Sequence, residues 1–223
     1  LKDTGYFKNI RVKKNEIKNS DNVDIQIDIN ESPTGEISAG IGAGTNESSI
    51  SFNFSEKNLL GQGIGFNLGA SLGTGSQTVN FNFTNPDFAS SGNFLSSGFF
   101  LSKYENETSG YENKLIGLNA STGFEWYEDV NLNYGIALDN DSLTAQSDAS
   151  TLIKERSGDY FTNKFFYTVK QDKRGRKINT EDGYTIGFGQ GIAHLGSDIP
   201  YLSNNFFGSF YNKFSESFIG SIR

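Results

Sequence analysis

Large apolar residues stand at every second position through much of the chain between Ile50 and Leu138, separated mainly by Gly, Ser, Thr or Asn. Residues 50–55 (ISFNFS) and residues 79–84 (VNFNFT) show the pattern. Period two sends successive side chains to opposite faces of a sheet, so these segments predict strands with one apolar face. The second face is small and uncharged, and residues 58–86 contain no Asp, Glu, Lys or Arg. This combination favours a membrane barrel, whose strands have lipid on one side and a water-filled interior on the other.

The composition is consistent with a barrel and excludes a bundle of membrane helices. Only 35% of the residues are hydrophobic, and no stretch approaches the roughly 20 predominantly apolar residues that a spanning helix needs. A barrel avoids this requirement because its strands bond to one another and only one face meets lipid. The 20 Phe and 10 Tyr are typical of strands and aromatic girdles, and the 26 Gly allow bends and close strand approach.

Charge and reactive side chains limit the possible functions. The net charge of -7 argues against nucleic-acid binding, which needs a basic surface. The chain has no Cys and one His, so thiolate chemistry is excluded and a zinc site is disfavoured. We therefore expect no metal, no cofactor and no enzymatic role. The chain also lacks Met and a signal peptide, so we expect a piece of a longer exported protein.

The first 32 residues differ from the rest. Residues 23–29 (VDIQIDI) alternate apolar residues with Asp or Gln, and residues 6–12 precede them as a second predicted strand. Charges on one face predict a half-buried hairpin in water. Two strands alone are marginally stable, so this hairpin should belong to a small domain that begins earlier. We divide the chain into residues 1–32 and residues 33–223.

From residue 36 onward the pattern predicts ten antiparallel, up-and-down strands and part of an eleventh, separated by turn residues. The expected ranges are 36–44, 49–55, 64–73, 77–84, 94–104, 113–122, 129–139, 159–170, 183–192 and 201–214, with the partial strand from 218. Connections appear short on one side and longer on the other, with the polar segment 140–157 the longest. This asymmetry is typical of outer-membrane barrels, whose short turns are periplasmic.

The sequence resembles the BamA family. The similar motifs occur in the family's order along essentially the whole chain. The first is the junction between the last polypeptide-transport-associated (POTRA) domain and the barrel: Gly5-Tyr6-Phe7, Val23-Asp24-Ile25, Glu31-x-Pro33-Thr34-Gly35 and Gly40-x-Gly42-x-Gly44. Further similar segments are Glu56-Lys57-Asn58-Leu59-Leu60-Gly61-Gln62-Gly63, Phe83-Thr84-Asn85-Pro86-Asp87-Phe88, Asp172-x-Arg174-Gly175-Arg176 and Thr180-x-Asp182-Gly183-Tyr184.

The resemblance implies that residues 1–32 end the last POTRA domain and that residues 33–223 form the N-terminal part of a barrel of roughly sixteen strands. The family folds and inserts barrel proteins into the outer membrane without nucleotide energy. Its implied partners are unfolded outer-membrane protein clients, periplasmic lipoprotein subunits of the assembly complex, and membrane lipid. The implied location is the outer membrane, with the N-terminal segment in the periplasm.

The same resemblance points to the first barrel strand as the functional element. We name it the seam strand, and its residues are Glu36, Ile37, Ser38, Ala39, Gly40, Ile41, Gly42, Ala43 and Gly44. The glycines share one face, and glycine contributes little cross-strand packing. We expect a weak lateral seam that opens so that a client strand can pair here. The simpler interpretation is that these glycines only relieve crowding in a curved wall.

The repeated large residues of the next three strands predict a lipid-facing wall. These wall residues are Ile50, Phe52, Phe54, Ile64, Phe66, Leu68, Val79, Phe81 and Phe83. A ligand-binding aromatic platform is the disfavoured alternative. The basic turn Asp172, Lys173, Arg174, Arg176 and Lys177 fits either a solvated turn or a contact with a partner or anionic lipid.

Three other functions remain open. The chain could belong to a related barrel that translocates or secretes polypeptides. A passive porin is disfavoured by the hairpin that precedes the barrel. A soluble β-sandwich adhesin would need more charge on the second face of the strands.

Overall fold

The computed structural model describes residues 5–16, 22–44, 48–175, 180–194, 196–216 and 218–223. These residues form two antiparallel sheets, one of two strands and one of eleven. The only helical turns among them are η2 (Phe88–Ser90) and α1 (Thr151–Glu155), both in connections between strands. No helix in these ranges is long and apolar enough to cross a membrane. The all-β class predicted from the alternation is confirmed.

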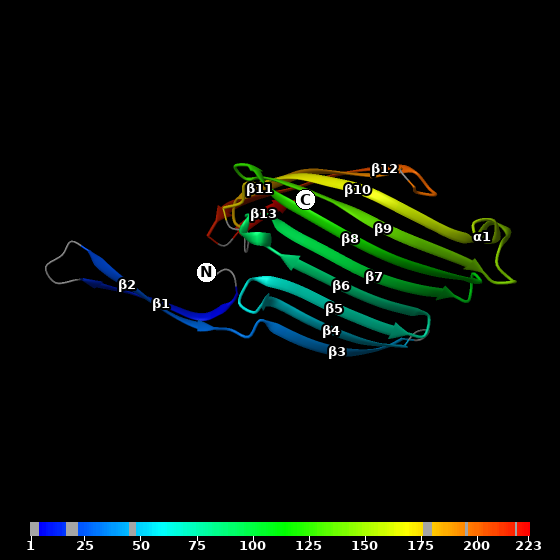
Figure 1. Ribbon diagram of the computed structural model, residues 1–223, viewed down its shortest axis with the longest axis horizontal. Coiled ribbons are helices and arrows are strands. Elements are labelled where there is room, and N and C mark those ends of the chain that lie inside the picture. Colours follow the sequence, from blue (N-terminus) through cyan, green and yellow to red (C-terminus); the bar gives the residue numbers. More distant parts are fainter. Residues whose placement is uncertain (1–4, 17–21, 45–47, 176–179, 195, 217) are drawn as a thin grey trace.

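The two-stranded sheet consists of β1 (Phe7–Glu16) and β2 (Val23–Glu31), and it projects from one end of the larger sheet (Figure 1). Val12 lies opposite Ile27 on one face, and Arg11 lies opposite Asp28 on the other. The apolar face is exposed throughout β2. The half-buried state predicted for this hairpin is therefore not seen, because nothing in the described part of the chain covers that face.

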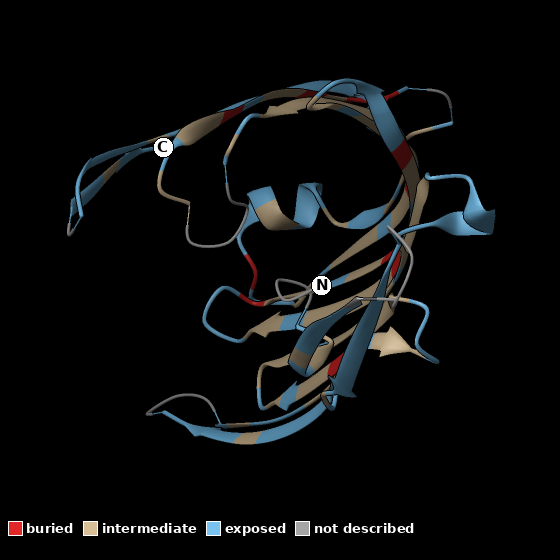
Figure 2. Ribbon diagram, turned by 90° about the vertical axis from the view of Figure 1, so that its left-hand side faces the viewer, coloured by how far each residue is buried: buried red, intermediate tan, exposed pale blue. Residues whose placement is uncertain are grey.

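The large sheet runs in sequence order from β3 to β13, and each strand pairs only with its neighbours along the chain. Its strands are β3 (Gly35–Ala43), β4 (Ser48–Leu59), β5 (Ile64–Gly73), β6 (Ser76–Asn85), β7 (Phe94–Asn106), β8 (Tyr111–Tyr127), β9 (Val130–Ala145), β10 (Gly158–Asp172), β11 (Gly183–Ala193), β12 (Tyr201–Ser215) and β13 (Phe218–Ile222). Figure 2 shows that they curve around an open interior. This is the partial, up-and-down barrel that was predicted, with the eleventh strand short.

Several strands are longer than the sequence pattern predicted, with β4, β8 and β9 extended most. The strand expected at 113–122 is β8, and the one expected at 129–139 is β9, which continues to Ala145. Much of the loop predicted at 140–157 is therefore strand. The longest connections at the two ends of the sheet, 173–182 and 146–157, are similar in length. The predicted difference between short and long connections is consequently weak.

The register gives the sheet one continuous apolar face. Phe54 lies opposite Leu68, and Phe66 lies opposite Phe83. The same face continues across β7, where Phe99 lies opposite Phe81. Among the described residues no large side chain is fully buried, so the sheet has no conventional core. Its strands are held by backbone hydrogen bonds and by cross-strand side-chain contacts.

Candidate strand-pairing edge

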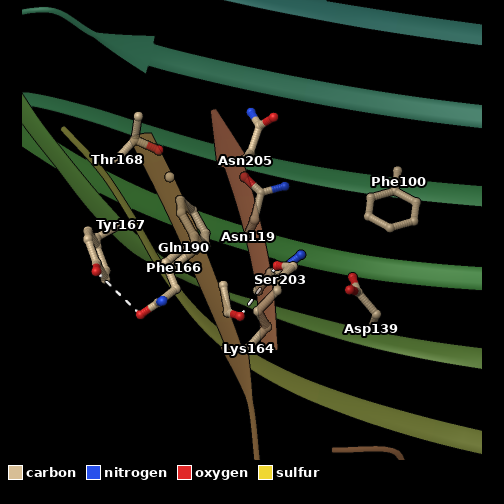
Figure 3. Close-up of a pocket in the computed structure, with 13 residues that line it drawn as sticks. Phe100, Asn119, Asp139, Lys164, Phe166, Tyr167, Thr168, Gln190, Ser203 and Asn205 are labelled. Atoms are coloured by element: carbon tan, nitrogen blue, oxygen red, sulfur yellow. Dashed lines mark hydrogen bonds between the residues drawn. The ribbon is translucent and has the colours of Figure 1, made fainter. Parts of the chain in front are cut away.

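The curvature distinguishes the two faces of the sheet. A cavity of about 460 Å³ is lined by residues of β7 to β12 (Figure 3). Asn119, Lys164 and Ser203 come from three different strands and line this one cavity. Side chains from strands so far apart can meet only on the concave side. We call this the inner face, and the opposite, convex side the outer face.

The predicted wall residues lie on the outer face. The register aligns Phe52 with Ala70 and Leu68 with Phe81, so the apolar positions of β4, β5 and β6 form one surface. The rings of Phe54 and Phe66 are 5.1 Å apart between centroids. The register thus places the following residues on one common face: Ile50, Phe52, Phe54, Ile64, Phe66, Leu68, Val79, Phe81 and Phe83.

β3, which contains most of the predicted seam strand, lies at one edge of the large sheet. It pairs with β4 from Gly35, opposite Glu56, to Ala43, opposite Ser48. Its other side has no strand partner among the described residues. A strand in this position presents a row of backbone N–H and C=O groups that can pair with another chain.

The side chains of β3 divide between the faces as the sequence predicted. Ile37 lies opposite Phe54 and Ile41 opposite Ile50 on the outer face, and Ile41 is 87% exposed. Gly40 and Gly42 lie on the inner face. Gly44, the last predicted residue of the seam strand, follows the end of β3.

On the inner face, β3 and β4 meet through glycine and serine. A Cβ on Gly40 would lie 2.9 Å from Ser51 Oγ, and one on Gly42 would lie 2.8 Å from Ser49 Oγ. The Ser51 hydroxyl donates a long hydrogen bond of 3.5 Å to the Gly40 carbonyl oxygen. Little side-chain area is therefore shared there, and the pairing of β3 rests mainly on its backbone bonds.

Other inner-face glycines are covered by aromatic rings. Phe100 lies directly opposite Gly117, and a Cβ on that glycine would fall 2.2 Å from the ring. Three more rings cover directly opposite glycines in this way: Phe94 over Gly123, Phe166 over Gly135 and Phe207 over Gly187. We did not predict these inner aromatic residues from the sequence. Adjacent pairs such as Phe99-Phe100, Phe165-Phe166 and Phe206-Phe207 are a usable signal, because one ring of each pair must face inward.

Next to the edge strand, three asparagines form a hydrogen-bonded row on the inner face. Asn67 Nδ2 donates to Asn53 Oδ1 at 2.7 Å, and Asn80 Nδ2 donates to Asn67 Oδ1 at 3.0 Å. The row crosses β4, β5 and β6. Strands β4 to β6 are therefore linked by side chains on this face, whereas the hydrogen bonds of this row do not extend to β3.

In the basic turn after β10, the Arg174 guanidinium is paired with a carboxylate. The Arg174 guanidinium donates two hydrogen bonds to the Asp172 carboxylate, at 2.6 and 2.7 Å, and Lys170 lies 3.1 Å from the same group. The hydrogen bond from Arg174 to Asp172 raises the pKa of the guanidinium. These contacts favour a structural turn at Asp172 and Arg174, whereas Arg176 and Lys177 lie outside the described residues.

An antiparallel up-and-down sheet with an apolar convex face and a polar, glycine-rich concave face is the wall of a transmembrane β-barrel. A family model described as the Omp85 superfamily domain matches residues 58–223. The chain therefore belongs to the Omp85 superfamily. Its fold and family place it in the outer membrane, so we treat β3 to β13 as strands of the membrane barrel.

Two relatives support this assignment. The outer membrane protein assembly factor BamA of Neorickettsia risticii (strain Illinois) is 23% identical over 224 residues, which cover 98% of this chain and 30% of that protein. The crystal structure of BamA from Haemophilus ducreyi lacking POTRA domains 1–3 matches with a TM-score of 0.66 and 24% identity, over 97% of this chain and 44% of that one. The chain thus spans less than half the length of each.

Proposed function

We propose that this chain is part of an outer-membrane assembly insertase, in which β3 pairs with strands of client barrel proteins and so guides their folding into the membrane. The observation that carries the proposal is the glycine–serine inner face that β3 shares with β4. The similarity to a protein named as an assembly factor supports it. In this proposal residues 1–32 belong to the last POTRA domain and residues 33–223 to the barrel.

The chemistry is strand addition and requires no covalent step. A client strand in the membrane must satisfy its backbone groups, because lipid offers no hydrogen-bond partner. The free edge of β3 supplies those partners along residues 35–43. An incoming strand replaces each backbone bond of the outgoing strand with an equivalent one, so a partner can be exchanged for another strand without leaving backbone groups unpaired in lipid.

The glycines make the exchange easier. Gly40 and Gly42 provide no side chain to interlock with a neighbouring strand on the inner face. A partner strand is therefore held by backbone bonds and by outer-face contacts with Ile37, Ala39 and Ile41. A seam of this kind can open without disrupting packed side chains, which is what a templating edge needs.

The outer face completes the proposed mechanism by holding the barrel in lipid. The wall residues on β4 to β6 form an apolar surface beside the edge. A client strand added to β3 would meet the same lipid environment and would continue this surface. The partners we propose are unfolded outer-membrane protein clients, periplasmic lipoprotein subunits and the membrane lipid itself.

A second candidate is a polypeptide translocation pore built on the same fold, and the polar inner face favours it. Asn, Ser and Thr side chains there would let a hydrated chain pass through the interior rather than along the edge. The two functions differ in where a client polypeptide touches the barrel.

Site-specific photocrosslinking in the full-length protein separates the candidates. A photoreactive residue is placed at Ile37 or Ile41 on β3, at Leu118 on the outer face of β8 as a matched control, and at Asn119 on the inner face. The insertase predicts client capture from β3 and none from Leu118. A translocation pore predicts capture from Asn119, and equal capture at Ile41 and Leu118 would contradict the role of the edge.

A further inference from the structure

Glu56 connects the linker between the two sheets to the large sheet. Its carboxylate accepts hydrogen bonds from the Thr34 hydroxyl at 2.5 Å and from the Asn58 backbone N–H at 2.7 Å. Thr34 lies between β2 and β3, and Asn58 lies near the end of β4. One side chain therefore joins the linker to the segment that leads into the β4–β5 turn.

The same carboxylate lies over the first residue of the edge strand. Gly35 pairs directly with Glu56, and a Cβ on Gly35 would lie 3.0 Å from Glu56 Oε2. The next outward-facing pair is Ile37 and Phe54, and on β5 Glu56 lies opposite the wall residue Phe66, so Glu56 lies at the border of the apolar surface. The charged group at this position has hydrogen-bond donors of its own, from Thr34 and Asn58.

Further contacts link the start of the two-stranded sheet to the β4–β5 turn. The Asn58 side chain accepts a hydrogen bond from the Gly63 backbone N–H at 2.7 Å, which closes the β4–β5 turn. The Tyr6 hydroxyl lies beside Gly63, and the Tyr6 carbonyl accepts a hydrogen bond from Ser32 N–H at 2.9 Å. The start of β1 and the end of β2 are thus joined to each other, and Tyr6 lies beside the β4–β5 turn, at the end of the large sheet from which the smaller one projects (Figure 1).

From this ring of contacts we propose that Glu56 is a positioning residue for strand addition: it fixes the two-stranded sheet relative to the barrel and holds the first residues of β3 on β4. The proposal rests on the proposed function of β3 as a templating edge. It implies that β3 is held at its Gly35 end and separates from a partner strand more easily near Gly40 and Gly42. A client strand then meets β3 in an orientation that is fixed relative to the two-stranded sheet.

Spin-label distances test the clamp independently of client assembly. In the full-length protein in liposomes, labels at D24C on β2 and E128C on the β8–β9 turn report how the smaller sheet is oriented. Glu56→Ala and Thr34→Val should each broaden the distance distribution, while Glu56→Gln, which keeps an acceptor oxygen, should retain the narrow one. Loss of a hydrogen bond to a charged group shifts the equilibrium between the bound and the released linker by about tenfold or more. The released linker should therefore make up a measurable fraction of the molecules.

Client assembly is measured on the same variants. Glu56→Ala and Thr34→Val should slow it by a factor of about two to ten, and the double variant should be no slower than the slower single one. Glu107→Ala, an exposed carboxylate in the β7–β8 turn, is the matched control and should change neither measurement. Thermal unfolding of the barrel should stay unchanged.

Three outcomes overturn the proposal: an unchanged distance distribution in Glu56→Ala, fully additive effects of the two single substitutions, or slower assembly that merely follows a loss of barrel stability. Failure of the proposed function would look different. In that case the unsubstituted protein would assemble no client, whereas the distances would still respond to Glu56→Ala.

Discussion

The ring of Phe100 lies across the backbone of Gly117, its direct cross-strand partner on the inner face. The ring covers backbone that would otherwise have no side chain above it. Because three other facing residue pairs between β7 and β12 repeat this arrangement and the β3–β4 strand pair has none, the inner face is well packed between β7 and β12 and sparsely packed at the edge.

Adding a methyl group under the Phe100 ring should destabilise the barrel. A Cβ on Gly117 would lie 2.2 Å from the ring, so Gly117→Ala forces the ring or the backbone to move. We expect a loss of about 1–3 kcal/mol in the free energy of unfolding, measured by urea denaturation in liposomes. Gly208→Ala is the control, since its Cβ would meet no atom closer than 3.5 Å. Equal losses for both variants would show that the ring contact is unimportant.

Valine at both seam glycines should make β3 hold its partner longer. Gly40→Val with Gly42→Val adds two β-branched side chains to the inner face of β3, at positions that now have no side chain. Strand propensity spans about 1 kcal/mol per position, so we expect release of a captured client to slow by roughly three- to tenfold. The measurement is the lifetime of the client crosslink in a pulse–chase experiment.

The matched control for that experiment lies one strand away. Ser49→Val with Ser51→Val introduces the same side chains on β4, at the positions opposite Gly42 and Gly40. These residues do not lie on the free edge, so client release should keep its normal rate. If both double variants slow release equally, the effect belongs to packing within the sheet and not to the seam.

A charge on the outer face should lower the free energy of unfolding far more than a charge on the inner face. Phe81→Arg places a guanidinium among the wall residues, and Asn82→Arg places one on the opposite face of the same strand. We expect Phe81→Arg to lower the free energy of unfolding in lipid by about 2–4 kcal/mol and Asn82→Arg by much less. Comparable losses would mean that the two faces have been assigned the wrong way round.

The middle of the asparagine row should contribute more than its ends. Asn67 makes one hydrogen bond to Asn53 and one to Asn80, whereas each end residue makes one within the row. Asn67→Ala should therefore cost about 1–2 kcal/mol of unfolding free energy, and Asn53→Ala about half of that. Urea denaturation of the refolded barrel gives both values. Equal costs at Asn67 and Asn53 would contradict the row as a connected unit.

The sequence was sufficient for the outer face and insufficient for the inner one. Period-two alternation determines which residues share a face, so the wall around Phe52 and Phe81 was predictable. It does not indicate which ring of Phe99-Phe100 faces inward, nor that the inward ring covers Gly117. Those facts depend on the register between strands, which places residues far apart in the sequence opposite each other.

The misplaced strand ends have a physical reason as well. Asn140, Asp141 and Ser142 are polar on both faces, which resembles a loop, yet they continue β9. Asp141 accepts a hydrogen bond from Asn113 at 2.5 Å, and Ser142 donates one to Asp159. A strand that extends beyond lipid is wet on both sides and needs no apolar face. The contact of Glu56 with Thr34 could not be predicted from the sequence either, because it depends on the pairing of β3 with β4.

The most direct test of the account is the register between β3 and a client strand. Single cysteines at Ala39 or Ile41 of β3 in the full-length protein are combined with cysteines at successive positions of a client's edge strand, and disulfide formation is measured during assembly. Strand templating predicts that the yield peaks at the client residue directly opposite the cysteine and that this peak shifts by two client residues when the cysteine moves from Ala39 to Ile41. Absence of disulfides during productive assembly, or yields without dependence on register, would contradict it.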